Sequence, residues 1–236
     1  MPDNGIAPSS PLVVDRPLTA NSRREFLRAL GVGGAIVLMP SMFAACSDVT
    51  GATSTTTKAV TLDLSTDVGI LNYAYALEQL EAAFYEEALK NIITGCTAAE
   101  LNALLQIGQH EVVHREFLKA ALGSSAIPTL QVNFSSIDLT KRDSVLQAAK
   151  TFEDTGVAAY NGAGKLIKSA AYLVLAGKIV SVEARHAATI RDFLEPKTMY
   201  FAGDDIIDAN GLDQAFAPSM VLPLVAPFIV TPISAA

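Results

Sequence analysis

The chain has 236 residues, of which 50% are apolar and 17% are charged, a balance that excludes a disordered polyelectrolyte and allows one core of ordinary size. Its 17 lysines and arginines against 24 aspartates and glutamates give a formal charge of −7, so we expect no nucleic-acid binding through a basic face. Two cysteines and three histidines exclude a disulfide-rich scaffold and a four-cysteine zinc site.

The N-terminal part of the chain has the pattern of an export signal. Arg23 and Arg24 precede a Phe-Leu pair, an apolar run over residues 29–39 and small residues before Cys46. The run is about half as long as the ~20 residues that span a membrane. The pattern resembles a twin-arginine signal, and residues 43–46 (Phe-Ala-Ala-Cys) resemble a lipobox, with cleavage after residue 45 without lipid as the alternative. We expect export to the periplasm or cell envelope, with a lipid on Cys46 anchoring the mature chain to a membrane.

Proline placement divides the rest of the chain. Between residues 41 and 195 the sequence contains a single proline, Pro128. Because proline breaks helix interiors, one helix-permissive stretch lies on either side of it. We expect four parts: a signal peptide (1–45), a flexible tether rich in Ser, Thr and Gly (46–59), a helical domain (60–195), and a Pro-rich C-terminal extension that packs on this domain (196–236).

Apolar residues at helical spacing predict four helices, over residues 66–93, 97–122, 140–166 and 169–194. Thr97 and Glu100 have the form of a capping box at the start of the second helix. The 17 residues from Gly123 to Leu139 reach at most about 56–61 Å when extended, which exceeds the ~39 Å length of a 26-residue helix. We therefore predict an all-α fold, a four-helix bundle of two antiparallel hairpins joined by a long crossover.

Two of the three histidines follow a glutamate by three residues. Glu111 precedes His114 in the second predicted helix, and Glu183 precedes His186 in the fourth. Residues at this spacing share a helix face, so a carboxylate and an imidazole can converge on one ion. Both pairs lie within apolar stripes, where an unpaired buried carboxylate is strongly penalised unless a cation or partner is present.

The first and third predicted helices supply counterparts to these pairs. Glu78 and Glu153 lie on apolar stripes, and each has a tyrosine seven residues later, Tyr85 and Tyr160. The order Glu…Tyr, Glu-x-x-His thus occurs twice, which is a weak internal repeat. Glu81, about 60° around the helix from Glu78, is the alternative first-helix ligand. The tyrosines are either hydrogen-bond partners of the carboxylates or plain core aromatics. The predicted metal ligands are Glu78, Glu111, His114, Glu153, Glu183 and His186.

Two motifs carry a resemblance to a known family, Leu-Glu-Gln-Leu-Glu-Ala-Ala-Phe-Tyr (77–85) and Val-Glu-Ala-Arg-His-Ala-Ala (182–188). From Val60 to about Leu194 the chain resembles the ferritin-like superfamily, and the motifs resemble its exported branch related to plant desiccation-related proteins. The resemblance implies two metal ions, one histidine for each, with Glu111 and Glu183 as bridging ligands and Glu78 and Glu153 as terminal ones. Hard carboxylates with one imidazole per ion favour iron or manganese without excluding zinc.

Three functions follow as hypotheses. In the first, the metal pair reacts with dioxygen or peroxide, which makes the protein a ferroxidase-like or other dimetal oxidoreductase without catalytic residues separate from the metal site. In the second, the metals stabilise a non-catalytic, stress-protective or desiccation-related envelope protein. In the third, the buried residues are a polar core without metal. A lipid anchor on every subunit fits poorly with a closed storage shell, and the sequence leaves open whether the chain forms a homo-oligomer.

A few further residues are expected to lie outside the site. His110 is about 100° away from the buried stripe of its helix and is expected on the surface. Cys96, between the first two predicted helices, is expected to be an inert thiol. Gly162 and Gly164 are expected to kink the third helix or to end it before residue 166.

Overall fold

The computed structural model describes residues 58–236. The expected signal peptide (1–45) with Arg23 and Arg24, the expected lipid site Cys46, and all but the last two residues of the expected tether (46–59) lie outside the described residues. Within the described part, none of the helices combines the length and the apolar character that a membrane span requires.

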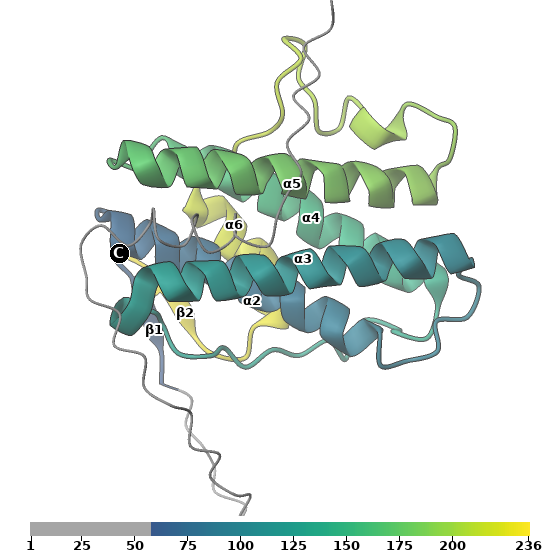
Figure 1. The fold of residues 1–236 in the computed structure, drawn as a ribbon, viewed down its shortest axis with the longest axis horizontal. Coiled ribbons are helices and arrows are strands. Elements are labelled where there is room, and N and C mark those ends of the chain that lie inside the picture. The colour runs from purple at the N-terminus through teal and green to yellow at the C-terminus, as the bar shows by residue number, and fades with distance from the viewer. Residues whose placement is uncertain (1–57) are drawn as a thin grey trace, which may run out of the picture. The chain divides into compact units, whose positions relative to one another are not determined.

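Four long helices form the body of the protein: α2 (Asp67–Ala88), α3 (Ala98–Leu122), α4 (Arg142–Gly164) and α5 (Ala170–Leu194). Helix α2 packs against α3 and α4 packs against α5, each pair joined by a short connection. A long segment, which includes the short helix η1 (Gly123–Ser125), leads from α3 to α4 along the bundle (Figure 1). The predicted all-α bundle of two hairpins with a crossover is confirmed.

The predicted start of α3 is confirmed, whereas the predicted end of α2 is not. Thr97 and Glu100 form the predicted capping box at the start of α3, with both reciprocal hydrogen bonds present. Helix α2, however, ends at Ala88 rather than at residue 93, because the chain turns at Lys90 and Asn91, whose N–H groups bond back to Glu87 and Ala88. Ile92, which falls within the predicted helix over residues 66–93, therefore lies beyond the end of α2 and is 86% exposed.

The C-terminal segment lies against the bundle through the helices η2 (Tyr200–Ala202), α6 (Pro218–Val225) and η3 (Ala226–Phe228). Helix α6 packs on α4. The last residues form strand β2 (Ile233–Ala235), which pairs in parallel with strand β1 (Val60–Leu62) just before α2. The sequence analysis did not predict this pair of strands, because each has only three residues and takes its partner from the other end of the domain.

Gly162 permits the close approach of this segment to α4. A Cβ on Gly162 would lie 1.8 Å from the carbonyl oxygen of Phe216, and the N–H of Phe216 donates to the carbonyl of Ala158 on the same helix. The helix continues through Gly162 and ends at Gly164, so the expected end before residue 166 is confirmed and a kink at Gly162 is not needed to explain it. The glycine therefore serves packing rather than a kink.

Two apolar clusters flank the middle of the bundle. The larger contains Phe84, Phe134 and Phe152, whose rings meet edge to face at centroid distances of 5.0–6.2 Å. The smaller includes Leu71 of α2, Leu118 of α3 and Ile179 of α5. Most of the buried charged side chains lie on the helices between these clusters, as described next.

Candidate metal centre

All four long helices contribute acidic side chains to the interior. Glu78 of α2, Glu111 of α3, Glu153 of α4 and Glu183 of α5 are each 0% exposed. The two histidines lie one helical turn beyond the glutamates of α3 and α5, so the Glu-x-x-His spacing directs each pair to the same face. The side chain of His186 is 5% exposed, and that of His114 is 12% exposed.

Glu111 and Glu183 each direct one oxygen toward each histidine. For Glu111, Oε1 lies 2.7 Å from Nδ1 of His186, and Oε2 lies 3.3 Å from Nδ1 of His114. For Glu183, Oε1 lies 2.7 Å from Nδ1 of His114, and Oε2 lies 3.7 Å from Nδ1 of His186. This is the arrangement that two carboxylates need if they are to bridge a pair of metal ions.

Glu78 and Glu153 each approach only one histidine. Oε2 of Glu78 lies 3.5 Å from Nδ1 of His114, and Oε2 of Glu153 lies 3.4 Å from Nδ1 of His186. Two overlapping groups of potential ligand atoms result, each within 4.8 Å: Glu78, Glu111, His114 and Glu183 in one, and Glu111, Glu153, Glu183 and His186 in the other. The structure thus brings together all six side chains that the sequence singled out.

Two tyrosines hold the outer oxygens of the unshared glutamates, and they do so across the bundle. The Tyr160 hydroxyl of α4 donates to Oε1 of Glu78 on α2 at 2.5 Å. The Tyr85 hydroxyl of α2 donates to Oε1 of Glu153 on α4 at 2.6 Å. Each tyrosine therefore orients the glutamate of the opposite hairpin. The glutamate and tyrosine that are seven residues apart on one helix share a face of that helix but are not hydrogen-bonded to each other.

The protonation of these residues differs strongly from that in water. Burial raises the pKa of Glu78 to about 8, with the charge of Glu183 adding to the effect. Burial opposes ionisation of Glu111 as well, but the neighbouring His114 and His186 outweigh it and lower its pKa to about 2. Burial also disfavours charged histidines, yet their carboxylate neighbours raise the pKa of both His114 and His186 to about 12. In the absence of metal, the protonated rings of His114 and His186 therefore supply the positive charge that balances the buried carboxylates.

The unpaired oxygens of the cluster fit a metal centre. Buried oxygens of Glu78, Glu111 and Glu153, and both of Glu183, have no hydrogen-bond partner of acceptable geometry within the described residues. Buried carboxylate oxygens are normally paired, and leaving several unpaired at one place is costly. Divalent ions that prefer oxygen and imidazole donors would satisfy them, with the two Nδ1 atoms deprotonated on binding.

Glu81, the alternative first-helix ligand, is also buried but belongs to neither group of ligand atoms. Burial, followed by the charge of Glu183, raises its pKa well above the usual range. Gly156 on α4 leaves room for it, because a Cβ there would lie 2.7 Å from Oε1 of Glu81. The structure therefore favours Glu78 as the α2 residue that faces the histidines.

His110 is exposed, as expected, but it also contacts the site. Its Nδ1 lies 2.9 Å from Nε2 of His186, the ring nitrogen that faces away from the carboxylates. The two rings are nearly parallel, at 14°. Burial and the neighbouring His186 lower the pKa of His110. The sequence analysis could not predict this contact, because helical periodicity describes the faces of a single helix and His186 lies on another helix.

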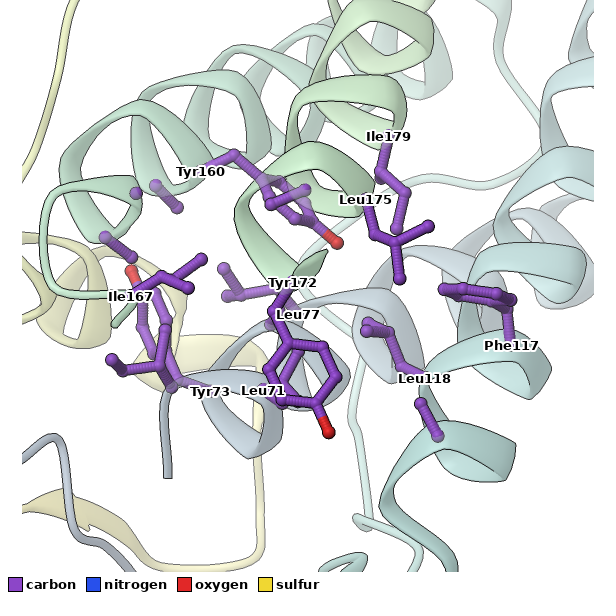
Figure 2. A pocket seen from close by; sticks show the side chains of 17 residues that line it. Leu71, Tyr73, Leu77, Phe117, Leu118, Tyr160, Ile167, Tyr172, Leu175 and Ile179 are labelled. Atoms are coloured by element: carbon purple, nitrogen blue, oxygen red, sulfur yellow. The ribbon is translucent and has the colours of Figure 1, made fainter. Parts of the chain in front are cut away.

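A narrow apolar pocket adjoins the cluster. Figure 2 shows side chains of the four long helices converging on it, among them Leu71, Leu118, Tyr160 and Ile179. Its cavity volume is about 30 Å³, which is enough for two or three molecules the size of water at about 10–15 Å³ each. Leu118 and Ile179 lie one turn from His114 and Glu183, and Tyr160 belongs to both the pocket and the cluster. None of the six clustered glutamates and histidines lines the pocket, and Tyr160 is the residue that links the two.

The fold and the site together define a ferritin-like four-helix bundle with a buried carboxylate and imidazole cluster. Comparison with known families agrees, since the family model described as a ferritin-like domain matches residues 66–196. The chain belongs to this family. No curated protein sequence matched the chain. The family and the buried Glu and His groups are compatible with a metal-binding site.

Proposed function

We propose that the protein binds two ions of iron or manganese in this cluster. Glu78, Glu111, His114 and Glu183 would hold one ion, and Glu111, Glu153, Glu183 and His186 the other. The observation that carries the proposal is the placement of Glu111 and Glu183, each with one oxygen near either histidine. Oxygen-rich donor sets with one imidazole per ion suit iron and manganese, although affinity alone does not exclude zinc.

The proposed activity is oxidation of Fe(II), or another two-electron reaction with dioxygen or peroxide. A bound pair of Fe(II) or Mn(II) ions would supply one electron from each ion to an oxidant. The protein residues hold the ligands in place: Tyr160 and Tyr85 fix one oxygen of Glu78 and Glu153, while the other oxygen of each faces a histidine. The surrounding apolar clusters exclude water from the site.

The apolar pocket supports dioxygen as the oxidant. It is lined almost wholly by aliphatic and aromatic side chains, and one of them, Tyr160, donates its hydroxyl to Glu78. A small apolar gas enters such a cavity without losing hydrogen bonds, whereas peroxide would lose those that it makes in water. The pocket is too small for a long-chain organic substrate.

Anaerobic loading with Fe(II) followed by exposure to oxygen tests the activity. We expect the wild-type protein to consume dioxygen as bound Fe(II) is oxidised, at a rate well above that of Glu111→Ala, which lacks a shared ligand. Circular dichroism of the variant controls for loss of the fold. Equal oxygen uptake by the two proteins would contradict the proposed redox function.

A second candidate is a non-catalytic, stress-protective or desiccation-related envelope protein in which the metal holds the bundle together. The observation in its favour is that the ligands come from all four long helices, so that binding links them directly. A large loss of thermal stability on metal removal, combined with no oxygen consumption, would select this function.

We further propose that the protein is exported and lipid-anchored at the periplasmic or envelope side of a membrane. The support is the sequence alone: the paired Arg23 and Arg24 before an apolar run, and Cys46 after small residues. The mass of the mature N-terminus from the native host tests this. A start at Cys46 with attached acyl chains is expected, and an unprocessed N-terminus would contradict it.

A further inference from the structure

The outer nitrogens of the two cluster histidines have different surroundings. Nε2 of His186 is 2.9 Å from Nδ1 of His110. Within residues 58–236, by contrast, Nε2 of His114 has no hydrogen-bond partner, and only its Nδ1 is engaged, by the carboxylates. The carboxylates around the two histidines are otherwise matched, since each histidine faces one unshared and two shared glutamates.

The internal repeat locates the origin of this difference. Alignment of α3 with α5 places Glu111 on Glu183 and His114 on His186, and it places His110 on Val182. A valine cannot accept a hydrogen bond. The chain therefore carries the imidazole partner in only one of its two related helices.

From this asymmetry we propose that His110 is a positioning residue for His186 and makes the ion on the His186 side the more tightly held of the two. The inference rests on the proposed metal centre. If Nδ1 of His186 holds a metal ion, its remaining proton is on Nε2, which then donates to Nδ1 of His110. This bond fixes the ring tautomer and its orientation and increases the basicity of the coordinating nitrogen.

Single-site backgrounds make the effect measurable one ion at a time. Glu78→Ala removes an unshared ligand on the His114 side and leaves the His186 side complete, and Glu153→Ala does the reverse. Co(II), added as the probe, is followed by its visible absorption and by calorimetric titration. His110→Val should weaken Co(II) binding about 10–100-fold in the Glu78→Ala background and change it less than about threefold in the Glu153→Ala background.

The related position supplies the matched control. In the double exchange His110→Val with Val182→His, we expect the tighter site to move to the His114 side, or at least the His186 side to lose its advantage. Thermal unfolding of each metal-free variant checks that the fold is retained. Rescue of His186-side affinity by His110→Gln, whose amide oxygen can accept the same bond, would separate hydrogen bonding from bulk.

Three outcomes would overturn the inference. Equal weakening of both sites by His110→Val, or no weakening of either, would refute the role of His110 while leaving the metal centre intact. Failure of the wild-type chain to bind Co(II), Fe(II) or Mn(II) at any position would refute the proposed centre and the inference with it.

Discussion

Within the cluster, individual residues with the same chemistry have different surroundings. Glu78 and Glu81 are on the same helix and both are buried, yet only Glu78 faces His114 and receives the Tyr160 hydroxyl. Glu81 lies beside Gly156, outside both groups of ligand atoms, and burial raises the pKa of its carboxyl well above the usual range. In the proposed metal centre Glu78 is therefore the ligand from α2, and Glu81 fills space beside Gly156.

Paired glutamine variants test this assignment. Glu78→Gln should lower the affinity for one of two Fe(II) or Mn(II) ions by at least about tenfold, because a charged ligand is replaced by a neutral amide. Glu81→Gln replaces a carboxyl outside both groups of ligand atoms by a group of similar shape and should leave both affinities within about threefold. Metal titration by calorimetry is the measurement, and loss of an ion only in Glu81→Gln would reverse the assignment.

The tyrosine hydroxyls act on single oxygens of the unshared glutamates. Removal of the Tyr160 hydroxyl by Tyr160→Phe leaves a buried oxygen of Glu78 without its donor, at a cost of about 1–3 kcal/mol in the metal-free protein. Tyr172→Phe is the control, because its hydroxyl has no hydrogen bond within the described residues, and we expect a change below about 0.5 kcal/mol. Chemical denaturation measures both, and equal effects would show that the Tyr160 hydroxyl contributes nothing specific.

Among the secondary-structure elements, the close contact between α4 and the C-terminal segment depends on Gly162. Gly162→Ala places a methyl group against the backbone of Phe216 and should destabilise the protein by about 1–3 kcal/mol. Gly177 of α5 has open space around its Cβ position, so Gly177→Ala should stabilise it by roughly 0.5–1 kcal/mol. Urea unfolding of the two variants gives the signs, and a stabilising Gly162→Ala would disprove the close contact.

The start of α3 is connected to two other helices by one arginine. Glu100 accepts hydrogen bonds from Arg142 at the start of α4, at 2.5 and 2.9 Å, and Arg142 also donates to the carbonyl of Phe193 near the end of α5. Burial opposes the charge on Glu100, but the bonds from Arg142 and Thr97 outweigh it and lower its pKa. The carboxylate of Glu100 is therefore favoured in the folded protein.

The lowered pKa gives the sign of a pH dependence. The stabilisation by Glu100 is complete above its unfolded pKa of about 4.3 and is lost as the pH falls through the lower folded value. Glu100→Gln should cost about 1–2 kcal/mol at pH 7, and the difference from wild type should shrink below pH 4. Thermal unfolding across this range is the measurement, and a difference that grew toward acid pH would contradict the ion pair.

At the scale of the whole molecule, the sequence predicts the features that depend on one helix at a time and misses those that depend on contacts between elements. The helix hairpins, the crossover and the six converging side chains follow from periodicity within each helix, because residues at i and i+3 share a face regardless of the partner. The crossed tyrosine bonds, the contact of His110 with His186 and the pairing of β1 with β2 depend on how separate elements pack. No spacing within one helix encodes those contacts.

The metal content of the purified chain tests the central claim most directly. After loading with Fe(II) or Mn(II) without oxygen and removal of excess metal, elemental analysis should find close to two ions per chain, one for each group of ligands. Glu111→Ala, which removes a ligand shared by both groups, should retain fewer than one while keeping its helical circular dichroism. A wild-type chain that retains no iron or manganese after loading would contradict the account.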